Sequence, residues 1–95
     1  MSVVIIGGNE CMERRYRDLC TAYHCKSRVY TKLHRDMQNF GSPDLLILFT
    51  GEMSHKMVHS ALSSIRGTNT RVARVGTGSM SALRKVLEEH VGSMK

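Results

Sequence analysis

Two short segments of this chain are apolar at every position, and they restrict the fold more than any other feature. Residues 3–6 read "VVII" and residues 45–49 read "LLILF". A strand with one face in water alternates apolar and polar side chains, whereas a parallel strand covered by helices on both faces does not. The two segments therefore predict the central strands of a parallel sheet, and hence an α/β fold.

Two further segments predict edge strands. Residues 26–31 ("KSRVYT") and 71–76 ("RVARVG") mix β-branched with charged side chains, which an edge position tolerates better than a central one. Apolar side chains at helical spacing follow the first, third and fourth strands. With right-handed crossovers, this order predicts a small Rossmann-like or flavodoxin-like sheet of four parallel strands in the order 2-1-3-4, with helices on both faces. We expect residues 1–92 to form this single domain and residues 93–95 to fray.

The charge balance is the most informative part of the composition. Lys and Arg number 14 against 8 Asp and Glu, a formal net charge of +6. Such an excess favours an anionic partner: a nucleic acid, a phosphorylated metabolite or a cofactor that carries carboxylates. The alternative is that the excess cations only keep a small protein soluble.

The chain shows no sign of membrane insertion or export. No apolar run approaches the roughly 20 residues of a membrane span, and "MSVVIIGGNE" lacks the basic leader of a secretory signal. We therefore expect a cytoplasmic protein with no membrane partner. Cys11, Cys20 and Cys25 are odd in number and lack zinc-ribbon spacing, which predicts reduced thiols rather than a disulfide.

The predicted strand order also predicts where a ligand binds. The chain reverses direction between the first and third strands, so the loops that follow them diverge and open a crevice. Each loop precedes a helix N-terminus, where unpaired N–H groups favour negative charge. The neighbouring loop "GTGSMS", residues 76–81, lies beside them. The residues predicted to bind a cofactor here are Gly7, Gly8, Asn9, Thr50, Ser54, His55, Thr77 and Ser79.

Each of these features has a simpler structural interpretation. Paired glycines after a first strand usually let the backbone turn, and "GGNECM" lacks the complete dinucleotide fingerprint. Glu10 disfavours a phosphate at the first loop because its carboxylate competes for the same N–H groups. "GTGSMS" contains no acid and is the better candidate for an anion site, although capping of a helix alone explains Ser79.

His55 and His59 form the candidate metal pair. Their i, i+4 spacing allows both imidazoles to share one helix face. A third ligand is needed, and Glu52, Cys11 and His34 are the candidates. The alternative is two imidazoles in solvent, and this alternative is stronger for His59 than for His55, which opens the helix at the crevice.

A basic rim is predicted near the same place. Lys32, Arg35 and Lys56 are positioned in the sequence to border the crevice, where they can pair with carboxylates or phosphates. The alternative is that these cations are simply solvated.

Three stretches resemble the bacterial domain-of-unknown-function family 2325. They are "VVIIGGNECMERRYRDLC", "SPDLLILFTGEMSHKMV" and "SMSALRKVLEEH", and the resemblance runs over nearly the whole chain. The most specific parts are the Gly-Gly exit from the first strand and the Ser-His pair at positions 54 and 55. Longer relatives carry His-Asp-Gly-Gly after the second strand, where this chain has "LHRDM". They also often carry a cysteine late in the second helix, where Ile65 and Arg66 stand here.

The resemblance implies a haem site, because some members of that family are suspected of binding haem. Carried to this chain, it makes His55 the axial ligand of the iron and the basic rim the partner of the propionates. The macrocycle is then expected in the crevice or at an interface between subunits. A homodimer or a larger homo-oligomer is expected, because so small a sheet leaves edges and helix flanks to cover.

The sequence thus favours a non-enzymatic cofactor-binding or sensing domain, with haem as the cofactor. A phosphate-binding or nucleotide-binding module that uses "GTGSMS" is the first alternative. A nucleic-acid-binding adaptor is the second, and it is weakened by the presence of only three Tyr, two Phe and no Trp for base stacking. No nucleophile, base and orienting residue stand at a spacing that indicates an enzyme.

Overall fold

The computed structural model describes residues 1–32 and 41–92. The strands are β1 (Ser2–Gly7), β2 (Lys26–Tyr30), β3 (Leu45–Phe49) and β4 (Arg71–Val75). The helices are α1 (Glu13–Ala22), α2 (His55–Ser64) and α3 (Met80–His90), and two 3-10 turns are η1 (Glu10–Met12) and η3 (Thr50–Glu52). The expected frayed tail, residues 93–95, lies outside the described residues.

The four strands form one parallel sheet in the order β2-β1-β3-β4. This confirms the predicted α/β fold of the Rossmann or flavodoxin type and its strand order. Val4 lies opposite Arg28 of β2 on one side and Leu46 of β3 on the other, and Leu46 lies opposite Val72 of β4. The two segments that are apolar throughout are therefore the central pair, as predicted.

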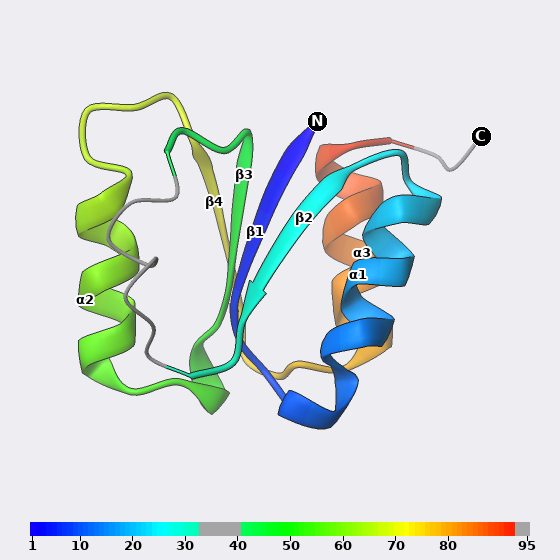
Figure 1. Ribbon diagram of the computed structural model, residues 1–95, viewed down its shortest axis with the longest axis horizontal. Coiled ribbons are helices and arrows are strands. Elements are labelled where there is room, and N and C mark those ends of the chain that lie inside the picture. Colours follow the sequence, from blue (N-terminus) through cyan, green and yellow to red (C-terminus); the bar gives the residue numbers. More distant parts are fainter. Residues whose placement is uncertain (33–40, 93–95) are drawn as a thin grey trace.

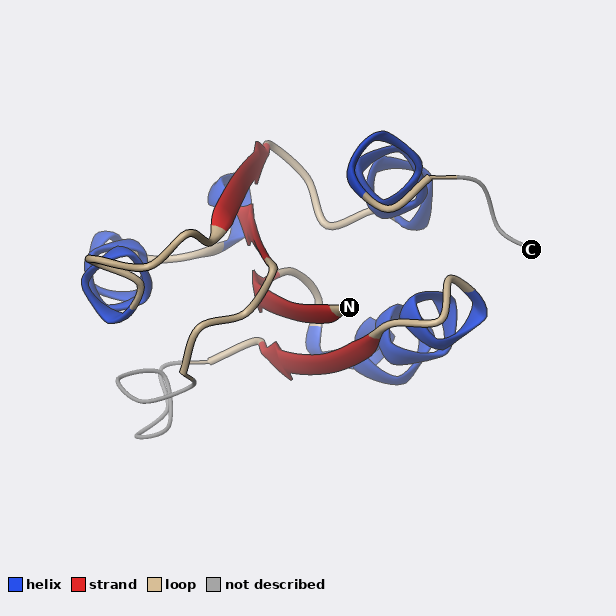
Figure 2. Cartoon of the chain, turned by 90° about the horizontal axis from the view of Figure 1, so that it is seen from above, coloured by secondary structure: helices blue, strands red, loops and turns tan. Residues whose placement is uncertain are grey.

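Helices cover both faces of the sheet. In Figure 1, α2 lies on the left of the sheet, and α1 and α3 lie on its right; Figure 2 shows the same separation from above. Each face has its own apolar cluster, because successive side chains of a strand point to opposite faces. Val3 and Ile5 join the cluster under α1 and α3, whereas Val4 and Ile6 join the cluster under α2.

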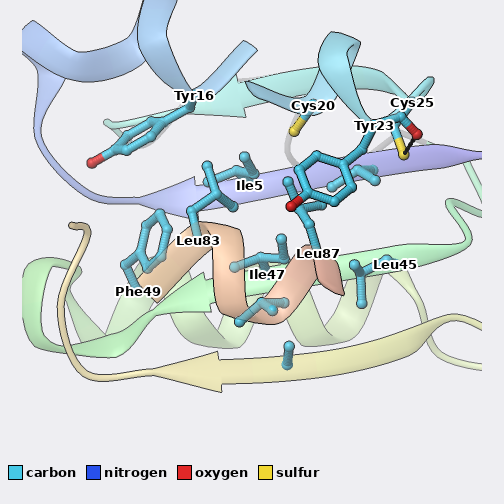
Figure 3. Packing of buried hydrophobic residues seen from close by; sticks show 13 residues of the cluster. Ile5, Tyr16, Cys20, Tyr23, Cys25, Leu45, Ile47, Phe49, Leu83 and Leu87 are labelled. Carbon is cyan, nitrogen blue, oxygen red and sulfur yellow. Dashed lines mark hydrogen bonds between the residues drawn. The ribbon is translucent and has the colours of Figure 1, made fainter. Parts of the chain in front are cut away.

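The cluster under α1 and α3 is the larger of the two. Ile5 and Ile47 lie at its centre, with Leu83 and Leu87 of α3 packed on them (Figure 3). All four side chains are fully buried. Burial of apolar surface at about 25 cal/mol per Å² makes these central positions the main source of stability.

The helix starts follow from the polar residues in front of them. Ser54 Oγ accepts from the Met57 N–H at 3.2 Å, and Ser79 Oγ accepts from the Ala82 N–H at 3.1 Å, so the two serines cap α2 and α3. Asn9 also acts as a cap, but of the η1 turn that precedes α1. Its Oδ1 accepts from the Cys11 N–H, two residues along, at 2.9 Å. This short-range bond closes the η1 turn, and α1 begins only after that turn.

None of the helices in residues 1–32 and 41–92 is long and apolar enough to cross a membrane.

Because the sheet lies between two layers of helices, a substitution in a central strand should lower the free energy of unfolding far more than one in an edge strand. Ile47→Ala removes a fully buried side chain from β3, so we expect a loss of about 3 kcal/mol in the free energy of unfolding. Val72→Ala on the edge strand β4, where the side chain is 37% exposed, should cost less than about 1 kcal/mol. Urea denaturation followed by circular dichroism measures both, and equal losses would contradict the assignment of β3 to the centre.

Candidate functional site

The loops that follow β1, β3 and β4 gather at the carboxyl edge of the sheet, at the bottom of Figure 1. They are packed closely against one another. A Cβ added at Gly8 would stand 2.8 Å from the Tyr16 hydroxyl oxygen, and one at Gly78 would stand 2.8 Å from the Gly8 Cα. Only glycine permits this approach, so the loops after β1 and β4 are in direct contact.

The hydroxyl of Tyr16 joins these two loops. It accepts from the Asn9 N–H at 3.1 Å and donates to the Gly78 carbonyl at 2.5 Å. The side chain is fully buried, and its ring centroid lies 5.5 Å from that of Phe49 (Figure 3). Tyr16 comes from α1, so one helix side chain holds the ends of two strands in place.

The loop after β3 is tied to the loop after β4. Glu52 Oε1 accepts from the Gly78 N–H at 3.1 Å, and the Gly51 N–H donates to the Gly76 carbonyl at 3.1 Å. The Thr50 hydroxyl donates to the Val75 carbonyl at 3.3 Å. A carboxylate of the protein itself therefore lies at an N–H group of the loop predicted to bind an anion.

The predicted cofactor residues divide into two groups in the structure. Gly7, Gly8, Asn9, Thr50, Ser54 and Ser79 take part in turns, caps or contacts between loops. Thr77 and His55 are exposed. At this edge, His55 is the predicted ligand with ring nitrogen atoms that make no hydrogen bond within the described parts of the protein.

His55 and His59 lie one helical turn apart on α2, and both are exposed. No group of three His, Cys, Asp or Glu residues that could hold a metal ion occurs in the described parts of the chain. Cys11 and Glu52 therefore do not complete a site with the two imidazoles. His34, the other candidate for a third ligand, lies outside the described residues.

The predicted basic rim is described only in part. Lys32 Nζ lies 3.3 Å from Glu10 Oε2, and both side chains are largely exposed. Lys56 is exposed on the first turn of α2. Arg35 lies outside the described residues. The Lys56 ammonium is therefore available to an anion. The Lys32 ammonium is in a solvent-exposed ion pair, which contributes little stability and is easily exchanged.

Comparison with known families matches residues 2–90 to the model of DUF2325, described as an uncharacterized protein conserved in bacteria. The chain belongs to this family. The match covers every strand and helix of the domain, so the Gly-Gly turn and the Ser-His pair that opens α2 lie within it. No curated protein and no solved structure matches the chain.

Two features of this DUF2325 domain escaped sequence reasoning. Tyr16 stands at helical spacing from Leu19, Cys20 and Tyr23, which indicates a packed ring but not the contacts of its hydroxyl, and Glu52 is predicted only as a candidate metal ligand. Their partners, Asn9 and Gly78, are backbone groups that no spacing identifies. The hydrogen bonds span as many as 62 residues, and the one available signal was the set of glycines in the two loops.

A hollow of about 600 Å³ lies at the opposite edge of the sheet. Asp44, Thr70, Arg71 and His90 are among the residues that line it. Asp44 Oδ2 accepts from the Ser2 N–H at 2.7 Å, and the Thr70 hydroxyl donates to the Pro43 carbonyl at 2.7 Å. Asp44 and Thr70 therefore have hydrogen-bond partners within the protein, and these bonds hold the segment before β3 in place.

The cysteines of this DUF2325 domain are free thiols in the described structure, as the sequence predicts. Cys11 is exposed, whereas Cys20 and Cys25 are buried. Burial raises the pKa of Cys20 from an ordinary 9.0 to about 11, and the nearby Cys25 adds to the rise while a hydrogen bond with Ser27 opposes it. The pKa of Cys25 is raised as well, chiefly by burial. Both buried thiols are thus protonated and unreactive at neutral pH.

The Tyr16 hydroxyl should matter more than its small volume suggests. Tyr16→Phe keeps the ring but leaves the Asn9 N–H and the Gly78 carbonyl without their partner, so we expect a loss of about 1–3 kcal/mol in the free energy of unfolding. Tyr23→Phe is the matched control, because its hydroxyl makes a single hydrogen bond within the described structure, a part-buried one that it donates to Glu88 Oε1 at 3.2 Å. Urea denaturation compares them, and a control that loses as much as Tyr16→Phe would refute the role of this hydroxyl.

The buried thiol of Cys20 predicts a loss of stability in alkaline solution. Its pKa is raised in the folded state, so its contribution is complete below about pH 9 and is lost as the pH rises through about 11. The free energy of unfolding should therefore fall more steeply over this range in the wild type than in Cys20→Ala. Cys11→Ala, which removes an exposed thiol, should keep the wild-type slope. Denaturation curves at a series of pH values measure it, and identical slopes for all three proteins would contradict the expectation.

Proposed function

We propose that this domain binds haem, with His55 as the axial ligand of the iron. The observation that carries the proposal is the state of the His55 side chain. It is exposed at the first residue of α2, and it makes no hydrogen bond or ion pair with the described residues. A neutral imidazole nitrogen with a free lone pair is a common axial ligand of haem iron.

The surroundings of His55 suit the other parts of the cofactor. Lys56 is the next residue and is exposed, so its ammonium group can pair with a propionate. Met53, two residues before His55, is half-buried against the apolar cluster under α2 and offers a thioether and apolar surface beside the imidazole. The donor types that haem requires are therefore adjacent in the chain.

An exposed imidazole covers only one face of a flat macrocycle. We propose that a second copy of the domain covers the other face, which makes the haem-bound form a homodimer. Two such edges would bring together two imidazoles and two sets of cations around one cofactor. This arrangement would allow a domain of this size to exclude water from the iron, as a sensor of iron or redox state requires.

The phosphate or nucleotide alternative stays a prediction with less support. The Gly78 N–H already donates to Glu52, and Ser79 Oγ is used in the cap of α3. A phosphate at this loop would have to displace the carboxylate and overcome its charge. No comparable competitor lies at His55 among residues 1–32 and 41–92.

A hemin titration of the purified protein tests the haem proposal. We expect a Soret band that saturates with added hemin, and His55→Ala should weaken binding about tenfold or more, because the axial bond is lost. His59→Ala is the matched control: it removes an equally exposed imidazole from the same helix and should titrate like the wild type. Size-exclusion chromatography with and without hemin tests the dimer.

Two outcomes would overturn this proposal. The absence of any saturable Soret band would remove haem as the cofactor. A His55→Ala protein that binds hemin as the wild type does, while His59→Ala does not, would transfer the ligand role to the second imidazole.

A further inference from the structure

The positive charge of this protein is gathered on one side of the sheet. The two helices on the right of Figure 1, α1 and α3, carry acids and bases in near balance. Their bases are Arg14, Arg15, Arg17, Arg84 and Lys85, and their acids are Glu13, Asp18, Glu88 and Glu89. By contrast, β2, α2 and β4 contain no acid.

The pleat directs three of the four cations of the edge strands toward α2, whereas Arg71, two residues before Ala73, lies on the opposite face. Val29 of β2 packs into the cluster under α1 and α3, so Lys26 and Arg28 point to the opposite face. Ala73 of β4 belongs to that same cluster, so Arg74 also points to the α2 side. All three cations are exposed. Arg28 and Arg74 stand on the two outer strands, three strand spacings (roughly 14 Å) apart across the sheet and offset by two residues along it. In Figure 1, α2 covers this face of the sheet.

The outer surface of α2 adds a line of polar groups between these arginines. Lys56, His59 and Ser63 follow one another at spacings of three and four and are all exposed, and Arg66 continues the line beyond the helix end. Met57 and Ala61 are buried on the opposite side of the helix. At 1.5 Å per residue, the line from Lys56 to Arg66 is about 15 Å long.

We propose that this surface binds the phosphate backbone of a duplex nucleic acid. It is made of Lys26, Arg28, Lys56, Arg66 and Arg74, with His59 and Ser63 between them, and we call it the basic α2 face. None of these five cations forms an ion pair within the described part of the chain. Such a concentration of unpaired cations is destabilising by itself and becomes favourable when phosphates neutralise it.

The chemistry of the basic α2 face selects among polyanions. Lysine, arginine, serine and histidine side chains are donors suited to phosphate oxygens, and a duplex presents one charge per about 1.7 Å along its axis. The exposed line carries no aromatic side chain, which disfavours single strands bound by base stacking. It also carries no large apolar side chain, which disfavours insertion into a lipid surface.

This inference does not rest on the haem proposal, although Lys56 has a part in both. The arginines at positions 28, 66 and 74 have no part in the proposed iron site, and His55 has no part in the basic α2 face. The small number of aromatic residues argues against a nucleic-acid partner that is bound by base stacking. It does not argue against contacts with phosphates. The net charge is evident from the sequence, whereas its division between the two faces of the sheet is evident only from the structure.

Fluorescence anisotropy with a labelled random-sequence DNA duplex of about 20 base pairs tests the proposal. The triple variant Arg28→Gln, Arg66→Gln, Arg74→Gln should bind at least about tenfold more weakly at about 50 mM salt. The slope of log affinity against log salt should become shallower by about 2 to 3, since each lost phosphate contact removes roughly 0.9. The matched control, Arg14→Gln, Arg17→Gln, Arg84→Gln, lowers the net charge equally on the other side and should keep most of the affinity and the slope.

The possible outcomes separate the proposal from its competitors. Equal losses in the two triple variants would overturn it, because binding would then depend on net charge alone. Binding to vesicles rich in anionic lipid without binding to the duplex would also overturn it, as would no binding to the duplex at low salt. His55→Ala protein that still binds the duplex supports the basic α2 face, whatever the hemin titration shows.

Discussion

The burial of β1 and β3 between two layers of helices is the constraint from which the rest of this structure follows. Val3–Ile6 and Leu45–Phe49 are buried along their whole length, and no other pair of segments in the described chain could fill the centre of the sheet. Once these strands lie side by side, β2 and β4 must take the edges, where their charged side chains reach water. The helix N-termini then collect at one end of the sheet, and the cations of the edge strands line one of its faces.

At the carboxyl edge, side chains of the protein form hydrogen bonds with the backbone groups that other α/β proteins use to bind substrates. The Tyr16 hydroxyl bridges the loops after β1 and β4, and the Glu52 carboxylate takes an N–H group of the third loop. These contacts join the loops of this edge to one another. In the haem proposal, the cofactor binds the His55 side chain, which is exposed at the start of α2 beside these loops.

Sequence reasoning succeeded where the signal lies in neighbouring residues and failed where it depends on the assembled fold. The uninterrupted apolar runs identified the central strands, and Ser54 and Ser79 were recognisable as caps because their partners lie three residues away. Tyr16 had the right spacing for a core residue, and its ring does pack in the core. Its hydroxyl, however, bonds to Gly78, and Glu52 reaches the same residue from another loop. Such bonds depend on how the loops meet, and no pattern within one segment encodes that.

The unequal cover of the two faces has a consequence for motion within the folded state. Among the described elements, two helices share the larger apolar cluster, whereas α2 is the one helix that covers the smaller one, through Met57 and Ala61. Local opening separates weakly buried elements first. We therefore expect α2 to lift away more readily than α1 or α3 and to expose Leu46 and Leu48 while the opposite layer stays intact. Any partner that holds α2 against the sheet thus also acts as a clamp that suppresses this breathing.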